Sequence, residues 1–446
     1  MISSIALTLI AISLLHMMWA NPFIGIMAWS WFSYMVPHKY TYGFTFDLQF
    51  VFAIAVVTGI AWFRSKRPFP FPAKSPVFIM LAVLFIHTTL TTILAYSFDA
   101  SFYRWNSMWK ILLLAVLTMD LCYTKHRFQV LIYIIALSIG YHAIKGGLFT
   151  IVTGGGFRVQ GPPASLIADN NILALVMAMS MPLWRYITLE ARRLWAKRLA
   201  MLIMLLTGVA IIGTHSRGGA LSIMMVMLWL FLISKRKLGF LSVIFILSIF
   251  SVQFMPQNWK DRMYTTTAYE TDDSATGRIQ MWHMATKMAN DRPLRGFGFA
   301  ALYNTESTIP YAPEHIPRRA THSIYFQQLM EHGYLGLYIF LMLLFTAMWT
   351  TSSVASVAKQ YEELTWARHL SNAIQASLVC YMIGGAFLEV VVIDLIYHLM
   401  AIAGALHIYV GRKVPELKPK ERKFTISGQV RRPESWKPAD LTSPAQ

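Results

Sequence analysis

Apolar runs of about 20 residues recur along almost the whole chain, and they limit its fold more than any other feature. A helix needs a run of this length to cross a lipid bilayer. The chain is 56% hydrophobic and 13% charged, whereas a soluble domain carries about 25% charged residues. A water-soluble core cannot bury so much apolar surface. The sequence therefore predicts an all-α fold, a polytopic transmembrane helical bundle.

The apolar runs predict about 12 spans. The first run begins at Met1 without the basic region and cleavage site of a signal peptide, so we expect a retained helix. The segments fall approximately at residues 2–36, 47–63, 76–95, 105–122, 128–147, 166–188, 199–214, 217–233, 239–255, 323–350, 370–388 and 393–410.

The basic residues alternate with the apolar segments in a way that predicts the orientation. Clusters of Lys and Arg follow every second segment, which by the positive-inside rule places those loops and both termini in the cytoplasm. This topology requires residues 2–36 to cross once, with a break near Asn21-Pro22. A hairpin there would give 13 spans and an external N-terminus. We favour the single crossing.

Four regions follow from this pattern: transmembrane helices in 1–255, a long periplasmic loop in 256–321, further transmembrane helices in 322–411, and a basic cytoplasmic tail in 412–446. The tail is predicted to be disordered and to lie on the anionic leaflet. Within the loop, Gly277–Met288 has helical spacing of apolar residues and predicts an amphipathic helix on the membrane or over the bundle. Its apolar positions are Ile279, Trp282, Met284 and Met288.

The net charge of +18 is accounted for by this topology, so we expect no nucleic-acid partner. Cys122 and Cys380 lie at or in apolar segments and give neither a disulfide pattern nor metal-ligand spacing. There is no Walker A run and no GxSxG elbow, and the external histidines lack the i, i+4 spacing of a zinc helix. The sequence predicts no metal and no cofactor.

His322 is the strongest catalytic candidate. The run Ala320–Tyr325 opens an apolar segment, which places His322 at the external boundary between water and membrane. A neutral imidazole there can accept a proton near neutral pH. The alternative is an interfacial histidine that hydrogen-bonds to the loop.

Arg217 is the strongest candidate for binding an anion. It lies between two apolar segments at the external face, after His215 and Ser216 and before two glycines. Arginine near lipid needs an anionic partner or a wet cavity, and its planar fork suits phosphate. The alternative is a snorkelling side chain or a structural salt bridge.

Two other arginines have weaker signals. Arg278 falls at the start of the predicted amphipathic helix, where backbone amides favour an anion. A solvated loop arginine is the alternative for this position. Arg158 follows three glycines in an external segment and could hold a phosphate.

Acidic and amide side chains near the external face are candidates for substrate binding or for support. Asp169, Asn170 and Asn171 could bind sugar hydroxyls or pack helices. Glu389 and Asp394 flank an apolar turn, where an acidic group is a functional candidate. Helix capping or pairing with arginine explains these two acids equally well.

The motifs together resemble O-antigen ligases and bacterial O-oligosaccharyltransferases. Arg217-x3-Leu221 resembles the RxxxL signature of that superfamily, and His322-Ser323 followed by Gly333 and Gly336 resembles its second signature. The stretch from Gly277-Arg278 to Gly298 is similar to the core of the superfamily. The N-terminal segment from Asn21 to His38 resembles the exosortase-associated branch of O-glycosylation ligases.

The resemblance implies a metal-independent transfer, on the periplasmic side of the bacterial cytoplasmic membrane. A glycan would move from undecaprenyl diphosphate to lipid A-core, with inversion at the anomeric centre. Arg217 and Arg278 would bind the diphosphate, with Arg158 as a weaker third group, and His322 would deprotonate the acceptor. Membrane lipids are the other expected partners.

The sequence leaves three other functions open. An O-antigen polymerase or a protein O-oligosaccharyltransferase would use the same donor with another acceptor. A lipid-linked glycan transporter would perform no chemistry, but it would place charges along a path through the bilayer rather than at one face. The donor sugar, the acceptor position and the oligomeric state do not follow from the sequence.

Overall fold

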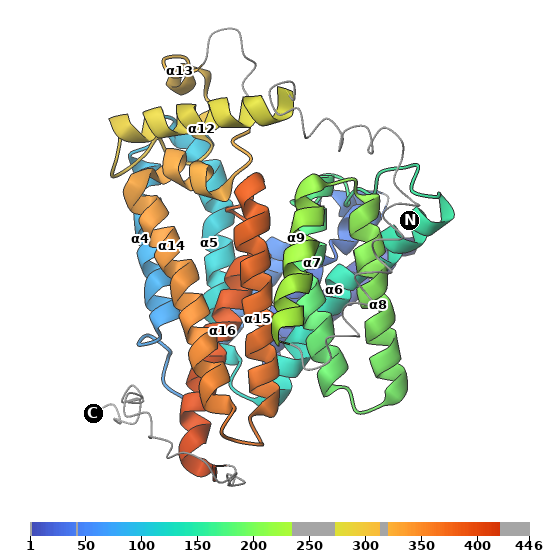
Figure 1. Cartoon of the computed structure of the whole chain (residues 1–446). Coiled ribbons are helices and arrows are strands. Elements are labelled where there is room, and N and C mark those ends of the chain that lie inside the picture. Colours follow the sequence, from blue (N-terminus) through green and yellow to red (C-terminus); the bar gives the residue numbers. More distant parts are fainter. Residues whose placement is uncertain (1, 42, 234–272, 313–319, 420–446) are drawn as a thin grey trace, which may run out of the picture.

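The computed structural model describes residues 2–41, 43–233, 273–312 and 320–419. Within these ranges the chain is helical and has no strand. Figure 1 shows a bundle of helices running side by side, with one helix, α12, lying across one end. The predicted polytopic helical bundle is therefore confirmed. The predicted span at 239–255 and residues 420–446 of the predicted tail lie outside the described residues.

The helices of the bundle agree with the apolar runs. Among the described residues, eight helices are long and apolar enough to cross a membrane, and α3 and α9 are shorter apolar helices. The bundle contains α1 (Ile2–Ala20), α2 (Pro22–Tyr34), α3 (Phe50–Arg64), α4 (Pro76–Ile93), α5 (Phe98–Leu121), α6 (Lys125–Val152), α7 (Asn170–Glu190), α8 (Leu194–Gly213), α9 (Arg217–Ile233), α14 (Ile324–Ala358), α15 (Thr365–Gly384) and α16 (Asp394–Lys413).

The central helices of the bundle are α7 and α16. Residues are buried over 78% of the apolar span in each of them, compared with 22% in α1. Both helices carry polar residues that lie inside the bundle, such as Ser180 in α7 and His398 in α16, whereas α1 is apolar on every side and presents most of its surface outward. The polar loops that connect the central helices are therefore held in place by the best-packed part of the molecule.

The basic loops meet at one end of the bundle, which we call the basic end. The ammonium nitrogen of Lys125 lies 5.6 Å from the ring centre of Trp366, and the guanidinium carbon of Arg412 lies 4.2 Å from the ring centre of Phe69. The Nδ1 atom of His369 lies 2.8 Å from a carboxylate oxygen of Glu190. These contacts join the connections after α3, α5, α7, α14 and α16. The alternation inferred from the charges is thus confirmed for these connections, and Lys235–Lys237 lie outside the described residues.

The first apolar segment breaks where the sequence predicts it. Asn21 has an extended backbone, its side chain accepts a hydrogen bond from the amide of Phe23 at 3.1 Å, and Pro22 occupies the first helical position. Asparagine before such a proline both ends one helix and starts the next. The break separates α1 from α2.

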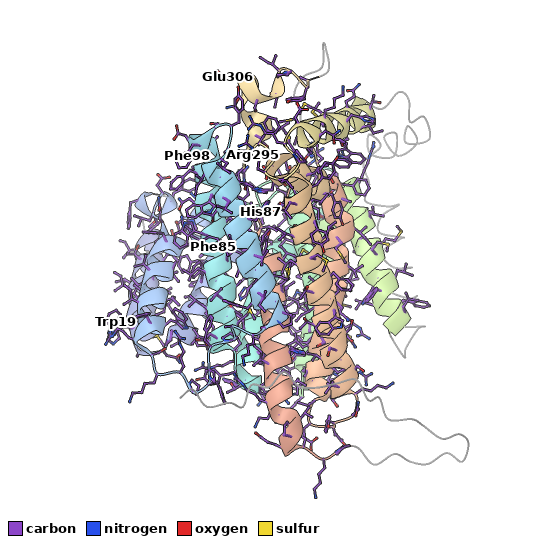
Figure 2. The ribbon with its side chains drawn as sticks, turned by 90° about the vertical axis from the view of Figure 1, so that its left-hand side faces the viewer. Trp19, Phe85, His87, Phe98, Arg295 and Glu306 are labelled. Carbon is purple, nitrogen blue, oxygen red and sulfur yellow. The ribbon has the colours of Figure 1, made fainter. Side chains whose placement is uncertain are left out.

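The two helices nevertheless form a hairpin rather than one crossing. Trp19, at the end of α1, lies under the guanidinium of Arg64 at 4.2 Å, so α1 ends at the basic end. Figure 2 shows Trp19 far from Phe98 and Glu306, which lie at the opposite end. The helix α2 then runs back, and its Tyr34 carbonyl accepts from His142 at 2.9 Å, deep in α6.

The predicted single crossing of residues 2–36 is therefore wrong. Ile2 lies at the end opposite the basic loops, so the N-terminal residues do not share the basic end with the end of α16. The physical reason is the extended Asn21, which reverses the chain without any charged residue in the turn. Hydropathy alone cannot separate such a turn from a kink.

A cap covers the end opposite the basic loops. It consists of α12 (Asp273–Asp291), η5 (Ala301–Tyr303) and α13 (Thr305–Thr308). The amphipathic helix predicted at Gly277–Met288 is thus present and longer at both ends. Its buried Met281, Met284 and Met288 pack on Phe297, Leu302 and Met330, while Ile279 and Trp282 are half-buried. Figure 1 shows α12 lying across the ends of α4, α5 and α14.

The cap is joined to the bundle at a break in α14. Gly333 has φ 71° and ψ −174°, a conformation open essentially to glycine alone. The break frees backbone groups that bind the segment from Pro293 to Gly298. The amide of Tyr334 donates to the carbonyl of Pro293 at 2.7 Å, and the amide of Gly298 donates to the carbonyl of Glu331 at 2.8 Å.

Substituting Gly333 with alanine is expected to destabilise the protein by about 3 kcal/mol or more. The backbone conformation alone costs about 1–3 kcal/mol, and the added Cβ would lie 2.4 Å from the Pro293 carbonyl oxygen. Thermal unfolding in detergent and protease sensitivity of the cap measure the effect. Gly59→Ala is the control, because nothing lies within 4 Å of its Cβ position in α3. An equal effect of both substitutions would contradict the assigned role of Gly333.

Candidate active site

His322 lies directly before α14, at the junction between the cap and the bundle. Its φ is 46°, in the left-handed region, where histidine is found more often than most residues other than glycine. The ring is half-buried, and its neighbours Thr321 and Ser323 are almost fully buried. The backbone therefore turns sharply at His322 while both flanking residues are fixed.

Contacts from two directions hold this turn in place. The indole Nε1 of Trp282 in α12 donates to the carbonyl of Thr321 at 2.8 Å, and the ring stacks on Phe326 at 4.9 Å. The hydroxyl of Thr321 donates to Glu389 at 3.0 Å. His322 is thus bracketed by the cap and by the connection between α15 and α16.

Glu389 belongs to a small group of charged and polar side chains beside His322. Its second oxygen accepts from the hydroxyl of Tyr303 at 3.1 Å. Glu331 is 4% exposed and accepts from the amide of Ala300 at 3.0 Å. Arg104 of α5 faces both Tyr303 and Glu331. Glu389 therefore lies beside the turn at His322, in a group that also contains two further charged residues, Arg104 and Glu331.

A signal for one of these two residues was present in the sequence. Glu331 lies within an apolar segment, where an acidic residue is a functional candidate by default. Arg104 gives no such signal, because it stands just before an apolar segment, where arginines commonly anchor a helix at the interface.

Arg278 is placed on the same side of α12 as the residue that holds His322. It precedes Trp282 by four residues, so the two side chains lie one above the other on the helix. The helix begins at Asp273, four residues before the predicted start. Arg278 is therefore in the second turn, and the prediction that it lies at the helix N-terminus is wrong.

Arg217 is the first residue of α9, and its side chain is exposed. Ser216 starts the helix, because its hydroxyl accepts from the amide of Gly219 at 2.9 Å. The end of α15 contacts both α9 and α14. A Cβ on Gly384 would lie 2.2 Å from the hydroxyl oxygen of Ser222, and one on Gly385 would lie 2.8 Å from Ile324. The starts of α9 and α14 therefore converge at the capped end of the bundle.

The two helix starts share a local motif. The motif is Thr-His-Ser, at 214–216 before α9 and at 321–323 before α14. In both copies the histidine backbone is in the left-handed region, with φ of 55° at His215 and 46° at His322. In both motifs the threonine and the serine are buried. Three residues are too short a repeat to be recognised from the sequence alone.

The surroundings of His215 favour the neutral form of its ring. Its Nε2 lies 3.0 Å from the carbonyl oxygen of Gly155. Burial lowers the pKa of His215, and the charge of Arg158 lowers it further, against the opposing effect of the Gly155 carbonyl. Arg158 is brought there by the neighbouring Val159, whose amide donates to the carbonyl of Gly213 at 2.9 Å. Arg158 thus lies beside the start of α9, with its side chain exposed.

Asp169, Asn170 and Asn171 have structural contacts in this region. Asp169 caps α7, because its carboxylate accepts from the amides of Asn171 and Ile172 at 2.8 and 3.1 Å. The side-chain amide of Asn170 donates to the carbonyl of Thr214 at 2.8 Å. The helix-packing alternative therefore accounts for these contacts, which tie α7 to the turn before Arg217.

Asp394 lies apart from the other candidates. It accepts a hydrogen bond from Ser33 and lines a cavity of about 250 Å³ with His38 and Lys110, whereas Glu389 is not among the residues of that cavity. The apolar turn between the two acids folds so that they face different parts of the bundle.

His332 of α14 serves helix packing. Its Nδ1 lies 2.6 Å from the hydroxyl oxygen of Thr91, and His87 contacts its carbonyl oxygen at 3.2 Å. Figure 2 shows His87 below the capped end, between the helices. Within the ranges that the structure describes, no three His, Cys, Asp or Glu side chains are grouped so as to hold a metal ion.

Comparison with known families agrees with this geometry. Residues 199–341 match the family described as O-antigen ligase. This match identifies residues 199–341 as an O-antigen ligase domain. The matched segment contains Arg217, Arg278 and His322, together with both Thr-His-Ser motifs. The chain thus has the helices of a multi-pass membrane protein and contains a domain of the O-antigen ligase/polymerase family.

The N-terminal part of the chain is less informative. Residues 2–192 match a family of unknown function (DUF5935). No curated protein matches the chain. The likeness to the exosortase-associated branch therefore stays a prediction.

The hydrogen bond between Thr321 and Glu389 is expected to position His322. Thr321→Val removes the donor, and a bond to a charged group contributes about 1.5–3 kcal/mol, so transfer should fall about tenfold or more. The fall should appear in kcat rather than KM. Glu389→Gln combined with Thr321→Val should cost less than the sum of the two single effects.

Thr286→Val is the matched control for this test. Thr286 also lies in the cap, but its hydroxyl donates to the carbonyl of Trp282 within the same helix. Transfer should stay within about twofold of wild type, since such a local bond contributes little. Fully additive effects at Thr321 and Glu389 would exclude the positioning role.

Proposed function

We propose that this protein is an O-antigen ligase that moves a glycan from undecaprenyl diphosphate to lipid A-core. One observation carries the proposal. His322 is fixed between the cap and Glu389, at the same end of the bundle as Arg217 at the start of α9 and Arg278 in α12. A site that joins two lipid-borne substrates has to lie at such a membrane boundary. We place this end in the periplasm of a bacterial cytoplasmic membrane.

The arginines would bind the diphosphate of the donor. A guanidinium presents five N–H donors and binds two phosphate oxygens at once. Arg217 and Arg278 are assigned to this role, and Arg158 is a weaker third group beside His215. Negative charge builds on the diphosphate as it leaves, so fixed positive charges stabilise the transition state more than the ground state.

His322 would accept the proton of the acceptor hydroxyl. The acceptor oxygen forms a bond to the anomeric carbon while the bond from that carbon to the diphosphate oxygen breaks. The electron pair departs with undecaprenyl diphosphate, and the proton passes to the imidazole. Attack from the face opposite the leaving group inverts the anomeric centre.

The groups around His322 support this assignment. Thr321 and Ser323 fix the backbone on both sides, so the imidazole can keep one orientation relative to the acceptor. Preorganised geometry of this kind is a main source of rate enhancement. Asp169 and Asn170 contribute indirectly, because they hold the turn that precedes Arg217.

Transfer in a purified system tests the proposal. Full-length protein in nanodiscs is mixed with undecaprenyl-diphosphate glycan and lipid A-core, with EDTA and without ATP. We expect glycan on lipid A-core under these conditions, as metal-independent transfer requires. Product on a second carrier-linked glycan would instead indicate a polymerase, and product on protein an O-oligosaccharyltransferase. Donor binding without transfer to any acceptor would favour a transporter.

A further inference from the structure

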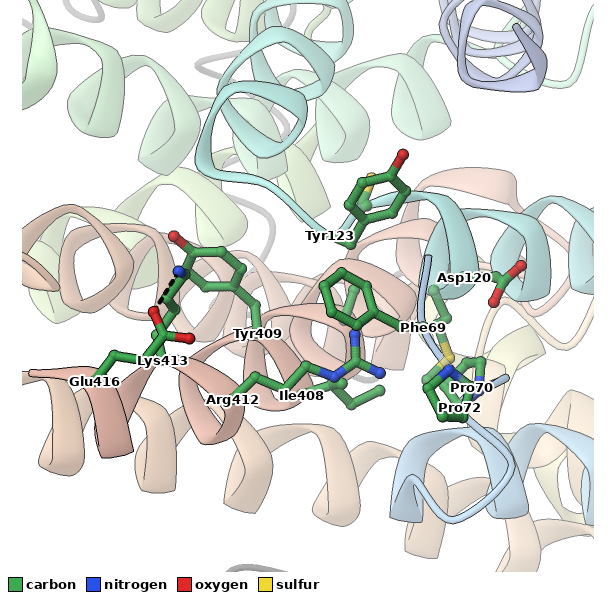
Figure 3. A pocket seen from close by; sticks show the side chains of 13 residues that line it. Phe69, Pro70, Pro72, Asp120, Tyr123, Ile408, Tyr409, Arg412, Lys413 and Glu416 are labelled. Atoms are coloured by element: carbon green, nitrogen blue, oxygen red, sulfur yellow. Dashed lines mark hydrogen bonds and ion pairs between the residues drawn. The ribbon is translucent and has the colours of Figure 1, made fainter. Parts of the chain in front are cut away.

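Two adjoining cavities lie at the basic end, far from His322. The larger has a volume of about 450 Å³ and lies among the turn between α1 and α2, the connection after α3, and the turn between α5 and α6. The smaller, of about 80 Å³, lies between that connection and the end of α16. Both are lined by Phe69, Asp120 and Tyr123. We call them the basic-end cavities, and Figure 3 shows the smaller one.

Taken together, the linings of the two cavities carry a net positive charge. Basic side chains outnumber acidic ones, and one of the two acids, Glu416, is paired with Lys413 at 2.7 Å. An uncompensated positive charge in a concave site attracts an anion. The basic residues are Lys66, Arg67, Arg127, Arg412 and Lys413, and the acidic residues are Asp120 and Glu416.

Asp120 serves to fix one of the arginines. The side chain of Asp120 is 5% exposed, and its Oδ2 accepts from the indole of Trp62 at 2.6 Å. The same oxygen lies 3.5 Å from Nε of Arg67, whose guanidinium stacks on Trp62 at 4.4 Å. A guanidinium has further N–H donors on its terminal nitrogens. Arg67 is thus held in place through its Nε, and the N–H groups of its terminal nitrogens can bind another acceptor.

Aromatic rings support the other two arginines in the same way. Arg127 stacks on Tyr123 at 4.0 Å, and Arg412 stacks on Phe69 at 4.2 Å. The rings of Phe69 and Tyr123 meet edge to face at 5.8 Å between the two cavities. Figure 3 shows Arg412 and Phe69 side by side at the cavity wall. Stacking orders the guanidinium groups and lowers the entropy lost when they bind an anion.

We propose that the basic-end cavities bind the phosphate of an anionic phospholipid from the adjacent leaflet. Basic pockets between transmembrane helices on that side suit such headgroups. The surrounding surface fits the rest of the lipid, because Phe63 and Trp19 are 82% and 50% exposed beside the cavities. A free phosphate ion would make no use of this apolar surface.

Lipid binding to the full-length protein tests the proposal. Native mass spectrometry of delipidated protein in detergent is titrated with phosphatidylglycerol and, separately, with phosphatidylcholine. A basic side chain that meets the lipid phosphate directly contributes a factor of about five. Lys66→Gln/Arg412→Gln should therefore weaken phosphatidylglycerol binding about twentyfold, and wild type should prefer phosphatidylglycerol to phosphatidylcholine.

The matched control removes one lysine and one arginine from the same end. Lys197→Gln/Arg198→Gln lies on α8, outside both cavities, and should change binding by less than about threefold. Equal weakening by both pairs, equal affinity for the two lipids, or displacement of lipid by millimolar inorganic phosphate would each overturn the proposal. Thermal unfolding of the lipid-free variants checks folding, and Lys66→Gln alone replaces the pair if that pair is unstable.

Discussion

Replacing His322 with alanine is expected to reduce glycan transfer by about 10²–10⁴-fold while the protein remains folded. The imidazole is the group assigned to take the acceptor proton, and alanine has no atom that can replace it. The side chain is half-buried at a turn whose neighbours supply the contacts to the cap, so truncation should leave those contacts intact. Single-turnover transfer with saturating donor isolates the chemical step from substrate binding.

His283→Ala provides the control for this experiment. His283 lies in α12, close in sequence to Trp282, but its side chain is exposed. Both variants remove an imidazole from the capped end, and donor binding should be unchanged in both. Transfer by His322→Ala at the rate of His283→Ala would exclude His322 as the base. A loss of donor binding in His322→Ala would instead indicate a binding role.

Most of the fold could be predicted from the sequence, because the local signals that set it are strong. Apolar runs marked the helices, and the spacing of Met284 and Met288 marked α12. The hairpin of α1 and α2 does not follow from the sequence, since its short turn carries no charged residue to mark a membrane boundary. Only contacts between distant residues, such as Trp19 with Arg64, define the direction of α1.

The candidate site could be predicted only in part, for a related reason. Arg217 and His322 stand at the ends of apolar runs, where position alone indicates the membrane boundary. Arg104 and Glu331 reach the site through contacts between α5, α14 and the cap, which are distant in sequence. The type of a side chain also does not fix its role. A carboxylate at that face could bind a sugar, but Asp169 caps a helix.

Replacing Arg217 with lysine is expected to reduce transfer by about 10–150-fold, although the positive charge is kept. Lysine cannot bind two phosphate oxygens through a planar fork, and a hydrogen bond to a charged group contributes about 1.5–3 kcal/mol. The loss should appear mainly in kcat, because the charge on the diphosphate grows as the glycosidic bond breaks. Arg295→Lys is the matched control, since Arg295 is an exposed arginine at the same end, as Figure 2 shows. If Arg217→Lys transferred glycan at the wild-type rate, the side chain would act through charge alone, and two-oxygen recognition of the diphosphate would have to be assigned to Arg278 or Arg158.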